Sequence, residues 1–204
     1  MNIRTLFSLA IVVLALGSAA CLPSGGRTGH AGPSGFAGQY AVALPEFASP
    51  VTREEIETAF ARYGSTAIVR KLHTGEAADW NMIMNRVAAG DAAWIRCVAE
   101  YILPGANGAA EEDIIVSFAY GLQTNPAAVL ASLGDGAGVS LDAVCSLPFE
   151  DQDRGFLENY GNRAMSALGK VRNAELVAPR NECINLMRGT LARAADGGYA
   201  AGRS

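Results

Sequence analysis

The sequence predicts an all-α fold, an irregular bundle of about eight short helices. After residue 50, apolar residues recur at spacings of three and four, the period of helices that face a core on one side. Helix-capping residues and glycines divide this pattern into short segments. No stretch alternates apolar and polar residues as a strand does, and only Ala67-Ile68-Val69 is strand-like. Stacking in helix pairs fits the pattern, although no repeat of fixed length supports a solenoid.

The first four helices are expected between residues 52 and 103. Thr52 and Glu55 form a capping box that begins a helix, and Gly64 is expected to end it. Ser65 is expected to cap a second, short helix. Asp91 is expected to cap the fourth, after a third that ends before it. The core-facing stripes of the third and fourth helices are Trp80, Ile83, Met84 and Val87, and then Trp94, Ile95, Val98 and Ile102.

The remaining helices follow in the same way. A run with Ile114, Ile115, Phe118 and Leu122 on its apolar face predicts one helix. Asn125-Pro126 predicts the start of the next, with Asn as the cap and Pro in the first turn. Ser140 is expected to cap a short helix through Cys145. A long helix carries Phe156, Tyr160, Ala164 and Leu168, and the last, opened by Pro179, carries Cys183, Ile184, Met187 and Leu191.

Residues 1–20 are predicted to be a signal peptide. Arg4 and the amino terminus supply a short positive region, and Leu6 to Leu16 is apolar except for Ser8. This run has the length of a signal-peptide core and is too short to cross a bilayer core of about 30 Å. The protein is therefore expected to be exported to the periplasm.

Two cleavage sites fit the residues that follow this run. Ser18-Ala19-Ala20-Cys21 resembles the lipobox of bacterial lipoproteins, apart from Ser18, where that pattern prefers Leu. The resemblance implies that Cys21 becomes the lipidated first residue, and Leu22 in place of Asp implies sorting to the outer membrane of a Gram-negative cell. Several acyl chains on one cysteine give a durable anchor, whereas one is marginal. In the alternative, Ser18-x-Ala20 is an ordinary signal-peptidase site and Cys21 stays a plain thiol.

Three further regions are predicted after the signal peptide. Residues 21–50 form a flexible tether, residues 51–196 a helical domain and residues 197–204 a disordered tail. The tether holds six glycines, four prolines and two charges, which is too little apolar surface to fold alone. A flexible chain of this length spans roughly 30 Å. Its segment Tyr40–Phe47 is more apolar and is expected to dock onto the helical domain.

The four cysteines predict one disulfide. In an oxidising periplasm a pair should close, and Cys145 and Cys183 are the expected pair, at the end of a short helix and within the last helix. Cys97 lies among apolar helix residues and is interpreted as a small buried hydrophobe. The alternative is a second bridge between Cys21 and Cys97, which requires that Cys21 is not lipidated.

Motifs of common enzymes are missing from the sequence. It has no Gly-x-Ser-x-Gly elbow, no phosphate-binding glycine loop, no Cys-x-x-Cys and no His-x-x-x-His, so no cofactor or metal is expected. A net charge of -4 argues against a nucleic-acid partner. Acidic clusters at Glu54-Glu55-x-Glu57 and Glu111-Glu112-Asp113 fall near helix starts, where negative charge is favourable. The functional alternative is a paired-carboxylate hydrolase site among them.

Three other side chains are of types that often function in catalysis or binding, but they are interpreted here as structural residues. His73 is interpreted as an exposed cation at a helix end, because no activated Ser or Cys can be matched to it. Trp80 and Trp94 are interpreted as core anchors. Exposure of either tryptophan would instead indicate a binding groove.

Segments within residues 80–149 resemble a group of exported helical proteobacterial proteins of unknown function. They are Trp80, Val87-Ala-Ala-Gly-Asp-Ala-Ala-Trp94, Leu103-Pro-Gly-Ala-Asn-Gly-Ala-Ala110, Asn125-Pro-Ala-Ala-Val-Leu130 and Val144-Cys-Ser-Leu-Pro-Phe149. The cysteine pair at 145 and 183 matches that group, whereas Cys97 and the lipobox do not belong to its pattern. A more distant likeness to small exported immunity proteins of bacterial toxin systems is an analogy of fold alone.

These observations together predict a non-enzymatic, lipid-anchored periplasmic protein whose helical domain binds a protein partner. Two alternatives are an envelope hydrolase that uses a carboxylate pair and an immunity-type inhibitor of a secreted toxin. Without residues 1–20 the chain has 15 Lys and Arg against 20 Asp and Glu, a net charge of -5. A charge this small does not identify the partner.

Overall fold

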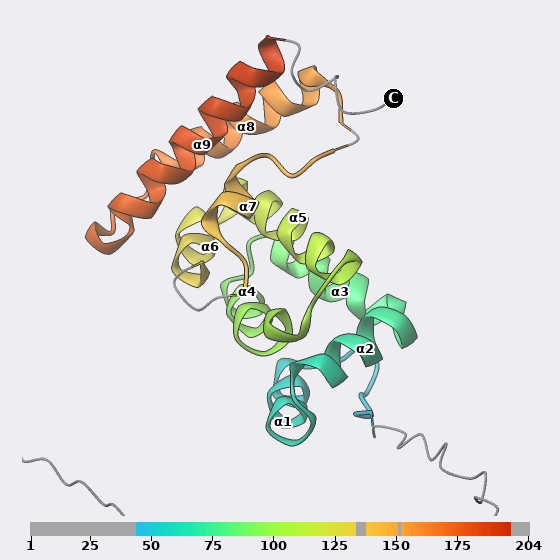
Figure 1. Cartoon of the computed structure of the whole chain (residues 1–204). Coiled ribbons are helices and arrows are strands. Elements are labelled where there is room, and N and C mark those ends of the chain that lie inside the picture. The colour runs from blue at the N-terminus through green and yellow to red at the C-terminus, as the bar shows by residue number, and fades with distance from the viewer. Residues whose placement is uncertain (1–43, 134–137, 151, 197–204) are drawn as a thin grey trace, which may run out of the picture. The chain divides into compact units, whose positions relative to one another are not determined.

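Every regular element that the computed structural model describes is a helix (Figure 1), which confirms the predicted fold class. The structure describes residues 44–133, 138–150 and 152–196. These ranges contain nine α-helices, two 3₁₀ turns and one π-helix. In chain order they are α1 (Arg53–Tyr63), α2 (Ser65–Gly75), α3 (Ala77–Ala88), α4 (Ala92–Cys97), the π-helix η1 (Val98–Ile102), η2 (Leu103–Gly105), α5 (Ala109–Thr124), α6 (Pro126–Ser132), α7 (Leu141–Cys145), α8 (Arg154–Leu168), η3 (Ala174–Leu176) and α9 (Val177–Ala195).

Helix α5 is the centre of the packing. It contacts α3, α6, α7 and α8, while α8 and α9 lie side by side (Figure 1). The apolar stripes that the sequence predicts meet in one continuous core. Trp80 and Trp94 are both buried in it, so their interpretation as core anchors is confirmed. The largest fully buried side chains include Tyr160, Phe118, Ile83, Ile95, Ile114 and Leu122.

Most predicted helix caps are confirmed. The capping box forms, since the Thr52 side chain accepts a hydrogen bond from the Glu55 backbone and the Glu55 side chain accepts one from the Thr52 backbone. Gly64 ends α1 with a φ of 75°, a left-handed conformation that favours glycine. Side-chain caps also form at Asp91, Asn125 and Ser140.

Two local predictions are wrong. Ser65 does not cap α2, because the helix already includes it and Gly64 occupies the cap position without a side-chain bond. Pro179 does not open the last helix, which begins at Val177. The strand-like Ala67-Ile68-Val69 belongs to the predicted second helix, α2, where all three side chains are buried.

The segment before α1 packs against the helices. The Val51 backbone N–H donates to Asp79 Oδ1 on α3 at 3.1 Å, and the Ala48 N–H donates to Glu55 Oε1 at 2.9 Å. Pro45 and Val51 are buried, and Phe47 packs partly buried against the core. The docking expected of Tyr40–Phe47 is thus confirmed for its described residues, from Leu44 onward, and residues 44–50 belong to the packed body.

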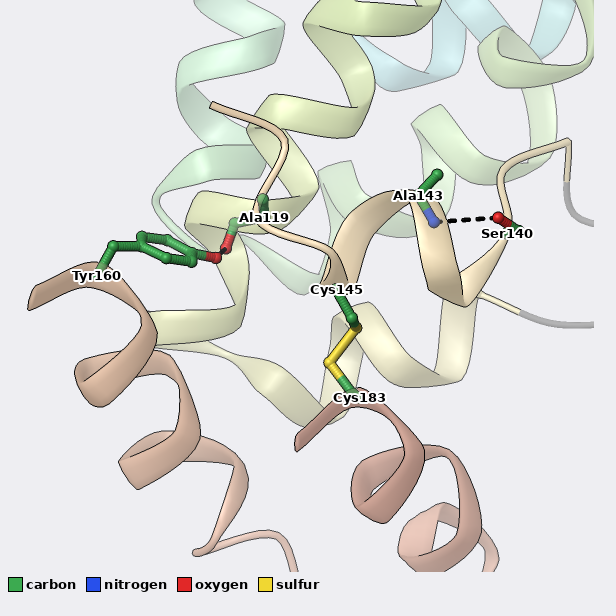
Figure 2. The surroundings of a disulfide bond; sticks show 6 residues. All are labelled: Ala119, Ser140, Ala143, Cys145, Tyr160 and Cys183. Atoms are coloured by element: carbon green, nitrogen blue, oxygen red, sulfur yellow. Dashed lines mark hydrogen bonds between the residues drawn. A yellow bond between two sulfur atoms is a disulfide. The ribbon is translucent and has the colours of Figure 1, made fainter. Parts of the chain in front are cut away.

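A disulfide joins Cys145 on α7 to Cys183 on α9, as the sequence predicts (Figure 2). Both cysteines are fully buried. A second attachment lies nearby, where the Tyr160 hydroxyl on α8 donates to the Ala119 carbonyl of α5 (Figure 2). Burial raises the pKa of Tyr160, which keeps its phenol protonated as the donor. These two links fasten the C-terminal helix pair to the rest of the described body.

Candidate functional site

A partly apolar groove of about 530 Å³ lies between α3, α5, α7 and the chain after α7. Its apolar lining comes from Trp80 and Met84 on α3, Ile115 and Val116 on α5, and Ala143 and Pro148 beyond them. Its polar lining is Asn81, Glu112, Asp113, Ser117 and Glu150. Among these, Glu112, Asp113 and Glu150 are carboxylates, and no Lys or Arg belongs to the described lining. We call this feature the acidic groove.

One wall of the acidic groove is held by a contact among three helices. The Trp80 indole Nε1–H donates to Asp113 Oδ2 at 2.9 Å, which joins α3 to α5. His73, near the end of α2, places Nε2 at 3.5 Å from the same oxygen. The His73 and Trp80 rings meet edge to face, with centroids 5.0 Å apart. Asp113 is therefore fixed in position although its side chain is 50 % exposed.

The opposite wall depends on a tight turn after α7. Leu147 has a φ of 60°, a left-handed conformation that is costly for a bulky residue by about 1–2 kcal/mol. Its side chain is 1 % exposed, so burial offsets the backbone cost. The Phe149 N–H then donates to the Leu147 carbonyl at 2.8 Å around Pro148. This turn brings Pro148 and Glu150 to the groove.

The disulfide also bears on this groove. Cys145 is the last residue of α7, and Ala143 of the same short helix lines the groove. A helix of this length has little stability of its own. Its attachments are the disulfide to α9, the Ser140 side-chain cap and the contact with α5. The covalent link that the sequence predicts therefore holds an element of the groove wall.

Some of the residues that the sequence singles out line the acidic groove, and the others lie elsewhere in the fold. Glu112 and Asp113 line the groove, whereas Glu111 does not. Both glutamates lie in the first turn of α5, as their interpretation as favourable helix-start charges expects. His73 is partly buried against Asp113 rather than freely exposed. Glu54 and Glu55 lie in the first turn of α1, away from the acidic groove.

Of the two remaining cysteines, Cys97 and Cys21, the structure describes only Cys97. Cys97 is a free thiol and 5 % exposed, which fits its interpretation as a small buried hydrophobe. Burial raises its pKa to about 12, so it is a poor nucleophile. Cys21, the predicted lipidation site, lies outside the described residues, as do the predicted signal peptide, the predicted tether up to residue 43 and the predicted tail at 197–204.

Sequence reasoning did not find the groove as a unit. The sequence places Ile115 on the core stripe of its helix, but its side chain is only partly buried, and Val116 lies next to it in the same groove. Two adjacent apolar residues beside a complete core stripe are the signal that a second apolar face exists. Pro148 and Glu150 carry no such signal, because their place depends on the turn at Leu147.

Comparison with known proteins does not assign the chain to a family. No family model, no curated protein and no solved structure matches it. None of the helices in the described ranges is long and apolar enough to cross a membrane. Those ranges also contain no group of three or more His, Cys, Asp or Glu side chains arranged to hold a metal ion.

Proposed function

We propose that this protein is an exported, lipid-anchored, non-enzymatic module that binds a protein partner through the acidic groove. The groove supports the proposal because it combines exposed carboxylates with apolar side chains on a rigid helical frame. Binding surfaces on proteins commonly pair an apolar centre with a polar rim. The two walls are fixed before any partner arrives, one by the Trp80–Asp113 hydrogen bond and the other by the buried disulfide. Such preorganisation lowers the entropic cost of binding.

The proposed export and the proposed lipid anchor rest on the N-terminal sequence. The apolar run Leu6–Leu16 and the lipobox-like Ser18-Ala19-Ala20-Cys21 support export and lipidation at Cys21. Residues 22–43, which lie outside the described residues, connect Cys21 to the packed body along the chain. In a Gram-negative host, the wild-type protein should sediment with outer membranes and Cys21→Ser should be released. A Cys21→Ser protein that still sediments would contradict the lipid anchor.

Site-specific photo-cross-linking in intact cells tests the binding site. A photoreactive residue at Asn81, which is exposed on the groove wall, should form a discrete adduct. The same residue at Arg188 on α9, exposed but outside the groove, serves as the control. The adduct from Asn81 should disappear when Val116→Asp is added, because a buried partner side chain would then meet a charge.

Two results would contradict this proposal. Equal adducts from Asn81 and Arg188, or an adduct unaffected by Val116→Asp in a protein of wild-type circular dichroism, would show that the groove is not the contact surface. A hydrolytic activity abolished by Glu112→Gln with an intact fold would favour the envelope hydrolase instead, since the groove carboxylate would then be catalytic.

A further inference from the structure

His73 and Asp113 meet at the wall of the acidic groove through a contact whose strength depends on charge. His73 Nε2 lies 3.5 Å from Asp113 Oδ2, which is an ion-pair distance. It is longer than the about 2.7–3.2 Å of an N–H···O hydrogen bond. A neutral imidazole gains little from a carboxylate at this distance, whereas an imidazolium is attracted to it. The link between α2 and α5 at this point therefore depends on the protonation of His73.

The contact of Trp80 with the same carboxylate has no such dependence. The Trp80 Nε1–H donates to Asp113 Oδ2 at 2.9 Å, and an indole N–H is a donor that does not titrate. The His73 ring also meets the Trp80 ring edge to face, with centroids 5.0 Å apart. One oxygen of Asp113 thus has a constant partner on α3 and a proton-dependent partner on α2.

Asp113 is the one charged group that pairs with His73 in the described part of the chain. Of the elements packed against α2, η2 has no ionisable side chain, and no titratable side chain of α1 or η1 forms a hydrogen bond or ion pair with His73. The charged side chains within one helical turn of the contact along α2, α3 and α5 are Arg70, Lys71, Glu76, Asp79, Glu111 and Glu112. Lys71 and Glu76 pair with each other at 3.2 Å. The protonation of His73 therefore acts on the groove through Asp113.

From this arrangement we propose that His73 makes the wall of the acidic groove pH-sensitive. Histidine changes its charge between about pH 5 and pH 8. In its protonated form, His73 pairs with Asp113, joins α2 to the wall that α3 and α5 form, and neutralises one of the groove carboxylates. In its neutral form, it leaves Asp113 with the Trp80 N–H alone and with an uncompensated negative charge in the groove. The inference concerns the wall itself and does not depend on a partner.

A double-mutant cycle, measured by urea denaturation of the full-length protein at about pH 5.5 and about pH 8, tests this coupling. His73→Gln removes the titrating ring. Asp113→Asn removes the charge, while its amide oxygen can still accept the Trp80 N–H. We expect His73→Gln to lower the urea midpoint by about 0.2–0.5 M more at the acidic pH than at the basic pH, which is the size expected of a partly exposed ion pair. In the Asp113→Asn background this difference between the two pH values should vanish.

A spectroscopic measurement locates the effect at the groove. The indole N–H resonance of Trp80 should shift between the two pH values in the wild-type protein, and this shift should be lost in His73→Gln. The indole resonance of Trp94 on α4 is the internal reference and should not follow the same titration. Glu112→Gln is the matched control, because it removes the neighbouring groove carboxylate but leaves the contact between His73 and Asp113 in place.

Several outcomes would overturn the proposal. A His73→Gln effect of equal size at both pH values would show that the contact is not proton-dependent. A pH-dependent effect that survives Asp113→Asn, or that Glu112→Gln abolishes equally well, would show that the general charge of the region is responsible and not this pair. A Trp80 resonance that does not respond to pH would remove the link to the groove wall. The cross-link from Asn81 tests the binding of a partner separately, so either conclusion stands without the other.

Discussion

Gly105 has no side chain, and this allows two elements of the fold to pack closely together. A Cβ at this residue would lie 2.3 Å from the backbone of both Ser65 and Thr66 at the start of α2. Backbone atoms cannot yield as a flexible side chain does, so η2 and α2 would have to separate. The close approach of these elements therefore depends on glycine.

We expect Gly105→Ala to lower the free energy of unfolding by about 2–3 kcal/mol, the range for a forced overpacking. Gly75→Ala is the matched control, because a Cβ there would meet nothing within 4 Å at the end of α2. That variant should be neutral or slightly stabilised, since alanine favours the helix. Urea denaturation measures both, and equal midpoints for the two variants would contradict the close-packing argument.

Cys97 allows the state of Cys21 to be read from a thiol count. Burial raises the pKa of Cys97 to about 12, so at pH 8 the folded protein should not react with a thiol reagent through this residue. Unfolding in guanidinium without reductant should then expose one thiol if Cys21 is lipidated, and two if Cys21 is free. No thiol after unfolding would indicate the Cys21–Cys97 bridge and contradict the free Cys97 of the structure.

At the scale of elements, Glu55 joins the start of α1 to the segment that precedes it. Its carboxylate accepts the N–H groups of Ala48 at 2.9 Å and Thr52 at 2.8 Å, and the Thr52 hydroxyl at 2.9 Å. The Ala48 and Thr52 backbone bonds, followed by the hydroxyl, lower the pKa of Glu55 from its usual 4.5. One side chain thus caps a helix and docks the incoming chain.

This lowered pKa predicts an acid-sensitive contribution to stability. Because the folded-state pKa lies below the unfolded one, the contribution is present above pH 4.5 and is lost as pH falls through the folded-state value. Glu55→Gln should therefore be less stable than wild type near neutral pH, with a difference that shrinks at about pH 3. Urea midpoints at the two pH values measure it, and a constant Glu55→Gln gap would contradict the assignment.

The elements were more predictable from sequence than the site that they form. Caps such as Thr52, Asp91 and Asn125 act within a few residues, so local sequence determines them. The groove depends on contacts across 33 residues, where Trp80 meets Asp113. A helical period shows which face of α5 is buried but not which helix covers it. The sequence indicates the carboxylates and the disulfide one by one, whereas their common location depends on the fold.

For the whole molecule, the attachment of α8 and α9 determines whether the described body unfolds as one unit. Cys145–Cys183 fastens α9 to α7, and Tyr160 fastens α8 to α5. Around Tyr160, aromatic rings from three parts of the chain meet, with Phe149 at 4.6 Å and Tyr120 at 6.1 Å between centroids. The core is continuous across this junction. We therefore expect a single cooperative transition for the wild-type protein.

Two probes can test this cooperativity, because their reporters lie in different parts of the body. Trp80 and Trp94 report on α3 and α4 by fluorescence, whereas far-ultraviolet circular dichroism reports on all helices. The two urea transitions should coincide for wild type, and non-coincident curves would contradict a single unit.

Cys145→Ala/Cys183→Ala removes a cross-link between residues 38 apart and should cost about 4 kcal/mol in the chain-entropy description. Adding Tyr160→Phe cuts the second attachment, so helicity should then begin to fall before the tryptophan signal changes. Coincident curves in this triple variant would show that apolar packing alone couples α8 and α9 to the rest, and that neither the disulfide nor the buried phenol is needed to keep the groove wall and the C-terminal pair in one cooperative body.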